Sequence, residues 1–237
     1  NETVFKRILI TKTIKPAFMK SKTLFLFFLI TLLIGINSCS KDDDSQDDPN
    51  DNSTPEAFTD PRDGQTYETV EIGNQVWFAE NLNYETENSW CYNNDPDNGD
   101  TYGRLYTWEA ALNACPDGWH LPGDEEWKTL EINLGMTQNQ ANITAYRGTD
   151  QGEQMKSVSG WSDSGNGTNS SGFNALPGGL RHKDGSFGYE GRGALWWTAS
   201  EHSDSKAWYR WLDYDFDQVR RYYYFKTTGA SVRCFKN

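Results

Sequence analysis

Residues 114–127 read ACPDGWHLPGDEEW, and they bring together a thiol, an imidazole and several carboxylates. Such groups can act as a nucleophile, a general base or metal ligands. A metal cluster is disfavoured, because the three histidines of the chain, His120, His182 and His202, are scattered in sequence. The segment is therefore a candidate site only through Cys115 and His120.

The same segment also has structural uses for its polar residues. Asp124 can cap a helix, and Glu125 and Glu126 in the first turn would interact favourably with the helix dipole. Trp119–Leu121 fits a short strand between two helices. The pattern predicts a scaffold, with His120 as a structural residue.

Two helices and a hairpin should surround this segment. Residues 69–78 alternate in polarity on both sides of a Gly-Asn pair, which is typical of a two-residue β-hairpin. Apolar residues recur at helical spacing in residues 102–115 and 124–134, and Pro116 ends the first helix. We expect two amphipathic helices packed on antiparallel β-hairpins.

The second half of the chain divides into a polar stretch and a strand-rich end. Residues 135–172 lose their periodicity and end rich in Gly, Ser and Asn, so we expect a long surface excursion. Residues 207–216 and 219–226 read as paired strands, and residues 230–234 as a last short one. The prediction is an α+β fold that ends in a Trp-rich antiparallel meander.

Composition indicates an acidic, well-packed domain. Ten Trp and 14 % aromatic residues in a chain of 237 are ample for a sizeable core. Residues 1–38 hold six of the 22 Lys and Arg and one of the 34 Asp and Glu, so the remainder has a formal charge of −17. The only dense basic pair after residue 38 is Arg220-Arg221. Nucleic acid is therefore not an expected partner, and neither is a membrane bound through a basic patch.

The amino-terminal residues have the pattern of a secretory signal. Met19 and two lysines precede the apolar run Leu24–Ile36, whose thirteen residues would form about 20 Å of helix. A bilayer core is about 30 Å thick, so residues 19–38 are expected to be a signal peptide and not a membrane span. Residues 1–18 precede a convincing start at Met19 and are expected to come from an over-extended reading frame.

Cys39 follows this signal in a sequence, Ile36–Cys39, that resembles the lipobox of bacterial lipoproteins, whose cysteine carries the lipid. Residues 40–44, SKDDD, resemble the acidic export signal of Bacteroidetes surface lipoproteins. Residues 39–58 have almost nothing to bury, and as a disordered tether they would reach about 25 Å. We expect a lipid anchor in the outer membrane as the only membrane contact, and a domain at 59–237 that faces the cell exterior.

Six motifs resemble the Fibrobacter succinogenes major paralogous domain over residues 60–237. They occur in the family's order and read WCYNN, YGRLYTW, ACPDGWHLPGDEEW, GFNALPGG, LWWTASE and SVRC. The layout is similar to the C-type lectin-like fold, and the Leu-Pro-x-x-x-Glu-Trp core also resembles the formylglycine-generating enzymes. The resemblance implies an extracellular domain, often found in lipoproteins, without an established activity.

An enzyme is not the expected function. Formylglycine-generating chemistry requires reactive cysteines in a groove, and no second thiol lies near Cys234 in sequence. No hydrolase-type Ser elbow or catalytic His/Cys motif is present. Asp213, Asp215 and Asp217 could suggest glycosidase chemistry, but alternation along one strand face explains them as a solvated edge. We expect no catalytic residue and no cofactor.

Calcium-dependent sugar binding is the alternative function. Residues 93–100 read NNDPDNGD and offer the oxygen ligands that calcium prefers, but they break EF-hand spacing. The tripeptides typical of C-type lectin sugar sites, Glu-Pro-Asn, Gln-Pro-Asp and Trp-Asn-Asp, are absent from the sequence. A polar turn without a metal is therefore expected there.

We expect a metal-independent binding or assembly module that recognises a glycan or an envelope protein. The chain has more Trp than one small core obviously needs, and Trp and Tyr give a large contact area at low entropy cost. Trp161 lies in the polar excursion, and four further candidates lie on the carboxyl-terminal strands: Trp196, Trp197, Trp208 and Trp211. Any single one of these four is more simply explained as a core residue, whereas the neighbours of Trp161 all favour a loop.

With Cys39 assigned to lipid, three cysteines remain, and an exported domain meets oxidising conditions. Three pairings are possible from the sequence. The resemblance matches the ACP and SVRC motifs to the paired ends of the family, which implies a Cys115–Cys234 disulfide. The second cysteine that the family usually has after WCYNN is replaced by residues 97–100, DNGD, so Cys91 is expected to be free.

The lipobox-like stretch predicts a mature chain that begins at lipid-modified Cys39. Metabolic palmitate labelling and intact mass in the producing cells test this. Cys39→Ala should abolish labelling, because the thiol is the attachment point, whereas Cys91→Ala should leave it unchanged. Labelling that survives Cys39→Ala would contradict the assignment.

Overall fold

The computed structural model describes residues 56–237. The expected signal peptide, Cys39 and residues 40–55 of the expected tether lie outside this part of the chain. Within the described part, no helix combines the length and the apolar character needed to cross a membrane.

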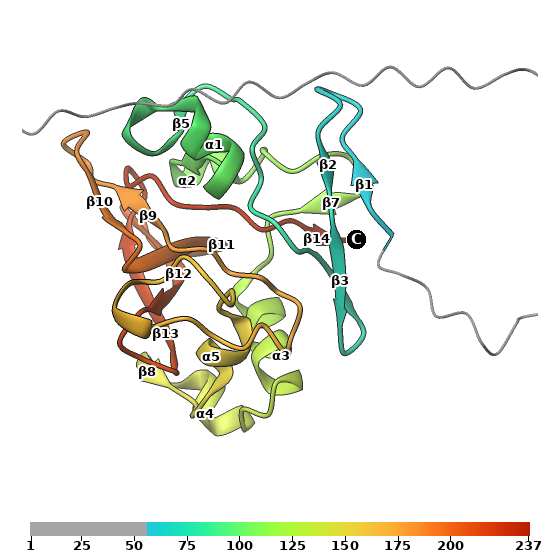
Figure 1. Cartoon of the computed structure of the whole chain (residues 1–237), viewed down its shortest axis with the longest axis vertical. Coiled ribbons are helices and arrows are strands. Elements are labelled where there is room, and N and C mark those ends of the chain that lie inside the picture. Colours follow the sequence, from blue (N-terminus) through green and yellow to red (C-terminus); the bar gives the residue numbers. More distant parts are fainter. Residues whose placement is uncertain (1–55) are drawn as a thin grey trace, which may run out of the picture. The chain divides into compact units, whose positions relative to one another are not determined.

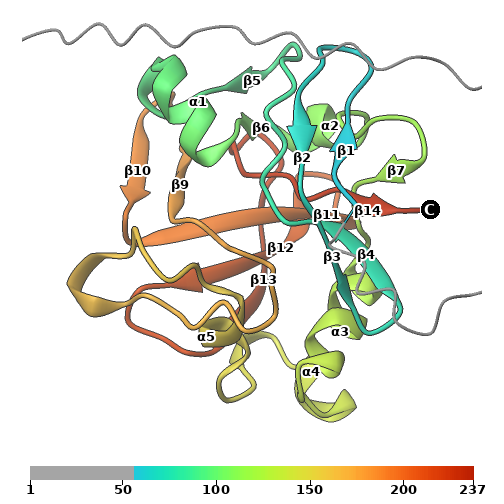
Figure 2. The same cartoon turned by 45° about the vertical axis from the view of Figure 1, so that its right-hand side comes forward.

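The larger sheet has six strands in the order β10-β9-β11-β12-β13-β8 (Figures 1 and 2). Its strands are β8 (Ala145–Arg147), β9 (Gly178–Arg181), β10 (Phe187–Glu190), β11 (Gly193–Ser203), β12 (Lys206–Asp213) and β13 (Val219–Phe225). All neighbours are antiparallel except β9 and β11, which are parallel. The predicted carboxyl-terminal meander is therefore confirmed as β11–β12–β13.

The other strands form smaller sheets. A four-stranded sheet has the order β3-β4-β14-β7, and two further pairs are β1-β2 and β5-β6. The bounds are β1 (Phe58–Thr59), β2 (Thr66–Tyr67), β3 (Thr69–Ile72), β4 (Gln75–Phe78), β5 (Ser89–Trp90), β6 (Leu105–Tyr106), β7 (Trp119–His120) and β14 (Phe235–Lys236). The predicted hairpin is β3–β4, with Ile72 opposite Gln75 and a positive φ of 64° at Gly73. A left-handed first turn residue suits a two-residue hairpin loop.

Short helices surround the sheets. They are α1 (Pro96–Tyr102), α2 (Trp108–Ala111), α3 (Asp124–Asn133), α4 (Gln138–Asn142) and α5 (Gln151–Met155), with two 3₁₀ turns at Tyr92–Asn94 and Ser162–Ser164. Figure 1 shows α3, α4 and α5 gathered near β12 and β13, and α1 and α2 near the opposite end of the molecule. The fold class is α+β, as predicted.

The first expected helix, over residues 102–115, is wrong in its extent. The helix α1 ends at Tyr102 because Gly103 takes a positive φ of 73°, and residues 105–106 then form β6. Backbone hydrogen bonds between Tyr106 and Ala230 hold this stretch extended. A new helix, α2, begins after Thr107, whose side chain caps it by accepting from the Ala110 N–H. Tertiary pairing overrides the helical period here.

The second expected helix is confirmed as α3, but its cap differs. The N-cap is Gly123, and the Glu126 carboxylate accepts a hydrogen bond from the Gly123 N–H at 2.6 Å. Asp124 is the first helical residue. It is buried because its carboxylate pairs with Arg210 and Arg221.

The expected surface excursion at 135–172 is also wrong. It contains α4, β8 and α5, and it buries Met136, Met155 and Trp161. Its polar residues make compact turns, as in the capping box of Thr137 and Gln140, so the stretch can pack closely without helical periodicity. Polar composition therefore does not mean exposure in this segment.

The expected last strand at 230–234 is displaced. Ala230 and Ser231 make only single bridges, to Tyr106 and Trp196, and the last regular strand is β14. This strand lies between β4 and β7, with Phe235 opposite both Trp77 and His120. The end of the chain thus completes the smaller sheet.

Two hydrophobic clusters pack against the two faces of β11. Leu195 and Trp197 belong to one cluster, whereas Ala194 and Trp196 belong to the other. This is the two-residue alternation of a strand that is buried on both faces. The core is thus built around the middle of the six-stranded sheet.

One disulfide joins distant parts of the domain. Cys115, just after α2, bonds to Cys234, just before β14, across a sequence separation of 119 residues. The predicted pairing is confirmed, and Cys91 is a free, half-buried thiol. The disulfide links the start of the ACPDGWHLPGDEEW segment to the carboxyl end.

Removing this disulfide should destabilise the domain strongly. In the entropic model, a loop of this length restricts the unfolded chain by about 5 kcal/mol. In urea denaturation, the free energy of unfolding of the double variant Cys115→Ala/Cys234→Ala should be lower than that of the wild type by about this amount. Cys91→Ala is the matched control and should change it little. A loss below about 1 kcal/mol in the double variant would contradict the role of the disulfide.

Candidate ligand-binding groove

Cys115 and His120 of the ACPDGWHLPGDEEW segment both make structural contacts. Cys115 is in the disulfide, and His120 lies in β7 with its Nδ1 2.6 Å from Asn237 Oδ1 and its Nε2 3.0 Å from Glu126 Oε1. Its ring meets that of Phe235 edge-on at 5.1 Å. His120 thus connects the start of α3 to the carboxyl end of the chain.

One acidic group of the 93–100 stretch has a structural partner. Asp95 caps α1 by accepting from the Asp97 N–H at 3.1 Å, so part of the 93–100 stretch forms the start of that helix. Across residues 56–237, no three His, Cys, Asp or Glu side chains are close enough together to hold a metal ion.

Four of the five candidate Trp residues are core residues. Trp161, Trp196 and Trp197 are 5 %, 0 % and 0 % exposed, and Trp211 is 7 % exposed. The indole of Trp161 donates to Ser157 Oγ and to the Ala175 carbonyl. The expectation that Trp161 is a surface binding residue is therefore wrong, because local hydrogen bonds let its ring enter the core.

Trp208 is half-buried on the face of the sheet opposite to Trp211. Its ring lies 3.8 Å from the Arg221 guanidinium and edge-on to Tyr223. The five predicted Trp residues therefore do not form one surface. Trp211 is the one whose ring lines a hollow.

That hollow lies on one face of β12 and β13. It has a volume of about 170 Å³ and is lined by Leu180, Tyr189, Leu195, Tyr209, Trp211, Asp213, Arg220 and Tyr224. A second hollow of about 340 Å³ shares Tyr224 and is also lined by His182, Lys183, Asp184, Ser186, Phe225 and Thr228. We call the two hollows together the aromatic groove.

Strand alternation brings these side chains to one face. Tyr209 and Trp211 in β12 pair with Tyr222 and Arg220 in β13, and side chains two residues apart in a strand share a face. The sequence VRRYYYF at 219–225 carried this signal, because its alternate residues are Arg220, Tyr222 and Tyr224. The pattern of residues 219–226 predicted the strand, but the face that lines the groove follows only from its register with β12.

Trp211 is held rigidly in the floor of the groove. Its indole N–H donates to Asp213 Oδ2 at 3.0 Å, and its ring meets the exposed ring of Tyr189 edge-on at 5.3 Å. A Cβ at Gly193 would overlap the Trp211 ring, so the glycine allows the ring to lie against β11. Only a residue without a side chain fits at Gly193.

Asp213 supports the groove through two neighbours. Its Oδ2 also accepts from the Tyr146 hydroxyl at 3.2 Å, and Tyr146 stacks on Phe216 at 4.2 Å. The expectation of a solvated edge therefore holds only for Asp215 and Asp217, which are exposed beyond the end of β12. Asp213 is half-buried because it orients two aromatic rings.

Two phenol groups at or next to the groove, those of Tyr209 and Tyr146, are neutral hydrogen-bonding groups at physiological pH. Burial raises the pKa of Tyr209 to about 12. Burial, followed by the nearby Asp213 carboxylate, raises the pKa of Tyr146 to about 12. Neither hydroxyl therefore carries charge at neutral pH.

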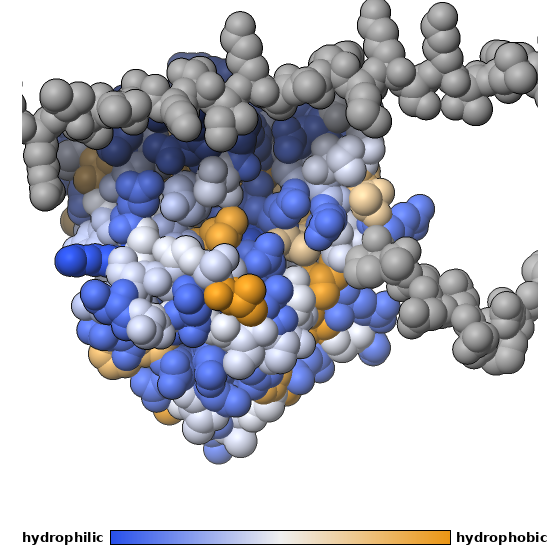
Figure 3. Space-filling view, viewed as in Figure 1, coloured by the Kyte–Doolittle hydropathy of each residue, from blue (hydrophilic) through white to orange (hydrophobic). Residues whose placement is uncertain are grey.

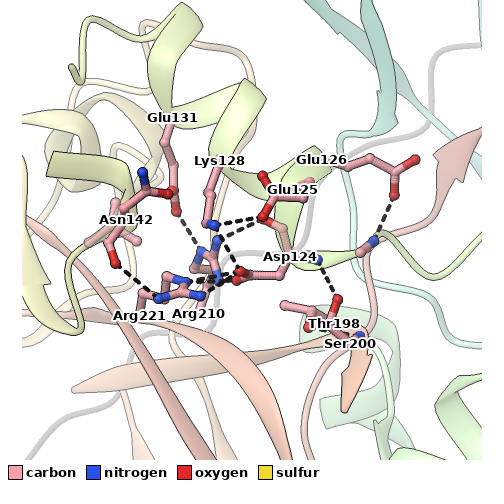
Figure 4. A network of polar contacts seen from close by, with 12 residues as sticks. Asp124, Glu125, Glu126, Lys128, Glu131, Asn142, Thr198, Ser200, Arg210 and Arg221 are labelled. Atoms are coloured by element: carbon pink, nitrogen blue, oxygen red, sulfur yellow. Dashed lines mark hydrogen bonds and ion pairs between the residues drawn. The ribbon is translucent and has the colours of Figure 1, made fainter. Parts of the chain in front are cut away.

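A buried ionic network lies on the other face of the same strands (Figure 4). Asp124 in α3 accepts from Arg210 Nη1 at 2.8 Å and from Arg221 Nη2 at 2.6 Å. Glu131, which lies further along α3, accepts a hydrogen bond from Arg210 Nε at 2.6 Å and pairs with Arg147 of β8 at 2.5 Å. The network therefore joins α3 to β12, β13 and β8.

The charges in this network are held firmly. Burial alone would raise the pKa of Asp124, but hydrogen bonds from Arg221 and the charge of Arg210 outweigh it and hold this pKa well below its usual range. Burial is the largest influence on Arg147 and lowers its pKa to about 10. Asp124 and Arg147 are therefore both charged at neutral pH.

The geometry defines a mixed α+β domain, closed by a disulfide, with an aromatic groove on its largest sheet. Residues 70–236 match the family model of the Fibrobacter succinogenes major domain. The match covers most of the chain, so the protein belongs to the Fibrobacter succinogenes major domain family. No match to it was found among curated proteins or among solved structures.

Loss of the Asp124 charge should destabilise the domain and remove part of its acid sensitivity. Asp124→Asn leaves Arg210 and Arg221 with a missing buried partner, which costs about 3–5 kcal/mol of unfolding free energy at neutral pH. The folded pKa of Asp124 lies below the unfolded value near 3.9. Its stabilisation is therefore present above about pH 4 and is lost as the pH falls below that value.

Urea denaturation at several pH values checks this. The difference between wild type and Asp124→Asn should be largest at neutral pH and shrink in acid. Glu125→Gln is the matched control, because the Glu125 side chain is 81 % exposed and should contribute less than about 0.5 kcal/mol. Equal effects of the two variants at neutral pH would contradict the network's role.

Proposed function

We propose that this protein is a lipid-anchored lipoprotein of the outer membrane, facing the cell exterior, and that its domain is a non-catalytic, metal-independent binding module for glycans. The observation that carries the proposal is the aromatic groove. Its rings lie on neighbouring strands, they are held by hydrogen bonds and packing, and polar groups converge beside them. A rigid, mostly aromatic concavity with a few placed polar groups is the usual form of a small-ligand site.

A glycan suits this surface better than a protein partner does. A specific protein interface buries about 800 Å² on each side and contains a central apolar cluster. Among the large exposed hydrophobic residues, Tyr189 and Phe225 line the groove, whereas Leu112, Ile143 and Val158 line neither of its hollows. Figure 3 shows a face that is largely hydrophilic with separate hydrophobic residues. A sugar chain needs only the groove, where flat rings offer contact area and hydroxyl groups offer hydrogen bonds.

The place of the protein in the cell rests on the sequence before the domain. The signal-like residues 19–38, the lipobox-like Ile36–Cys39 and the acidic residues 40–44 support lipid attachment and surface exposure. A tether of this composition would hold the domain away from the membrane. A module presented in this way would meet polysaccharides outside the cell.

We also propose that the domain is a variant of the C-type lectin-like fold. Support comes from the Cys115–Cys234 disulfide, which ties the end of an early helix to the last strand of the domain. The groove, however, is on the face of β12–β13 and is lined by aromatic rings. Sugar binding is therefore proposed to be independent of calcium.

Removal of groove rings should weaken glycan binding. We expect the full chain, purified in detergent, to bind at least one class of polysaccharide on a glycan array. Tyr189→Ala/Tyr224→Ala should weaken that binding at least about tenfold, which corresponds to the loss of about 1.4 kcal/mol of contact energy. EDTA should have no effect, and the bound oligosaccharide should be recovered intact by mass spectrometry.

Tyr223→Ala is the matched control. It is the neighbour of Tyr224 in β13 but stacks on His202 away from the groove. Tyr223→Ala should therefore leave binding unchanged. Binding that survives the double variant, or is lost with EDTA, would contradict the proposed site, and cleaved oligosaccharide would contradict the non-catalytic role.

A further inference from the structure

The adjacent residues Arg220 and Arg221 have opposite surroundings in the structure. Arg221 faces the buried network, where its Nε and Nη2 both donate to Asp124. Arg220 lines the aromatic groove on the other face of β13. The basic pair seen in the sequence is thus divided between the core and the groove.

Arg220 has no acidic partner within the described part of the chain. It takes part in none of the ion pairs found among residues 56–237. Its Nε is buried and has no hydrogen-bond partner. The guanidinium instead lies 5.3 Å from the Tyr222 ring and 5.6 Å from the Tyr146 ring. Aromatic faces attract a cation but do not neutralise it.

A second unpaired cation lies in the neighbouring hollow. Lys183 lines that hollow and has its Nζ 5.4 Å from the centre of the Phe225 ring. It, too, is in none of the ion pairs found across residues 56–237. Tyr224, which lines both hollows, lies between the two cationic ends of the groove.

The carboxylates of the groove already have hydrogen-bond donors of their own. Asp213 accepts from Tyr146, from Trp211 and, through Oδ1, from the Asp215 N–H. Asp184 accepts from both the N–H and the hydroxyl of Ser186. The groove therefore offers a ligand unpaired cationic donors, whereas its acidic groups are engaged within the chain.

We propose that the aromatic groove binds an acidic polysaccharide whose sugar rings carry carboxylates. One carboxylate pairs with the Arg220 guanidinium, a sugar ring lies against Tyr224, and a carboxylate further along the chain is placed near Lys183. A carboxylate suits Arg220 because its two oxygens match the planar fork of a guanidinium. This inference rests on the proposed glycan-binding function and adds the chemical class of the glycan.

The negative charge of the domain means that only contacts within the groove can attract an acidic glycan. The chain after residue 38 carries a formal charge of −17, so it does not attract a polyanion at long range. At physiological ionic strength such repulsion is largely screened beyond about 8 Å, whereas a pair in contact is screened much less. Affinity for an acidic glycan must then depend on the groove cations themselves.

Paired polysaccharides provide the test. The full chain in detergent is titrated with galacturonan, alginate and hyaluronan, and with the same polymers after chemical reduction of their carboxyl groups to alcohols. At least one acidic polymer should bind, and carboxyl reduction should weaken that binding at least about tenfold, because the sugar rings remain while the partner of Arg220 is lost.

Substitution of Arg220 checks the contact. Arg220→Gln should weaken binding of the acidic polymer about tenfold and leave binding of the reduced polymer unchanged. Arg220→Lys should restore part of the loss, since it keeps the charge but not the fork. The matched control is Lys236→Gln, an exposed cation in β14 of the other sheet, which should have no effect. Unchanged circular dichroism of the variants would show that the fold is retained.

The outcomes separate this inference from the proposed function. Equal binding of acidic and reduced polymers, with Tyr189→Ala/Tyr224→Ala still defective, would overturn the acidic ligand and keep the glycan-binding module. Preference for sulfated over carboxylated polymers would also overturn it. Failure of the protein to bind any carboxylated polymer would overturn the acidic ligand as well. If the protein also bound no neutral glycan, the proposed glycan-binding function would be wrong.

Discussion

Two carboxylates on one helix pair with three arginines on three strands, and the remainder of the domain is arranged around this contact. Asp124 and Glu131 of α3 receive Arg210 of β12, Arg221 of β13 and Arg147 of β8. Breaking such a buried network leaves uncompensated charge in the core, which costs several kcal/mol. The pairing therefore allows only arrangements in which these strands face α3 in this register.

That constraint reaches the opposite face of the sheet. A shift of one residue in β13 would bring Arg221 to the groove and Arg220 into the core, because neighbouring side chains lie on opposite faces. With Arg221 bound to Asp124, residues Arg220, Tyr222 and Tyr224 must face the other way. The buried network thus determines which side chains the aromatic groove displays, although it contributes none of them.

Local patterns in the sequence predicted the parts of the fold that depend on local chemistry. The β3–β4 hairpin follows from its Gly-Asn turn, α3 from its periodicity, and the meander from aromatic strands. The Cys115–Cys234 bond followed from the family resemblance.

Contacts between residues far apart in the chain could not be predicted from local patterns. The 102–115 helix is interrupted by pairing with Ala230, and Trp161 is buried by hydrogen bonds to Ser157 and Ala175. The groove is lined by residues from five strands, β9 to β13, and only the alternation in VRRYYYF indicated part of it in the sequence.

We propose that ligand binds over Trp211, in the floor of the aromatic groove on β12–β13. The most direct measurement is the two-dimensional ¹H–¹⁵N spectrum of the Trp indole groups during titration with an acidic oligosaccharide. The Trp211 signal should shift, because its N–H supports Asp213 in the floor of the groove, whereas those of the buried Trp161, Trp196 and Trp197 should stay in place. Shifts confined to Trp208, on the other face, or an unchanged Trp211 signal at saturation would contradict the account.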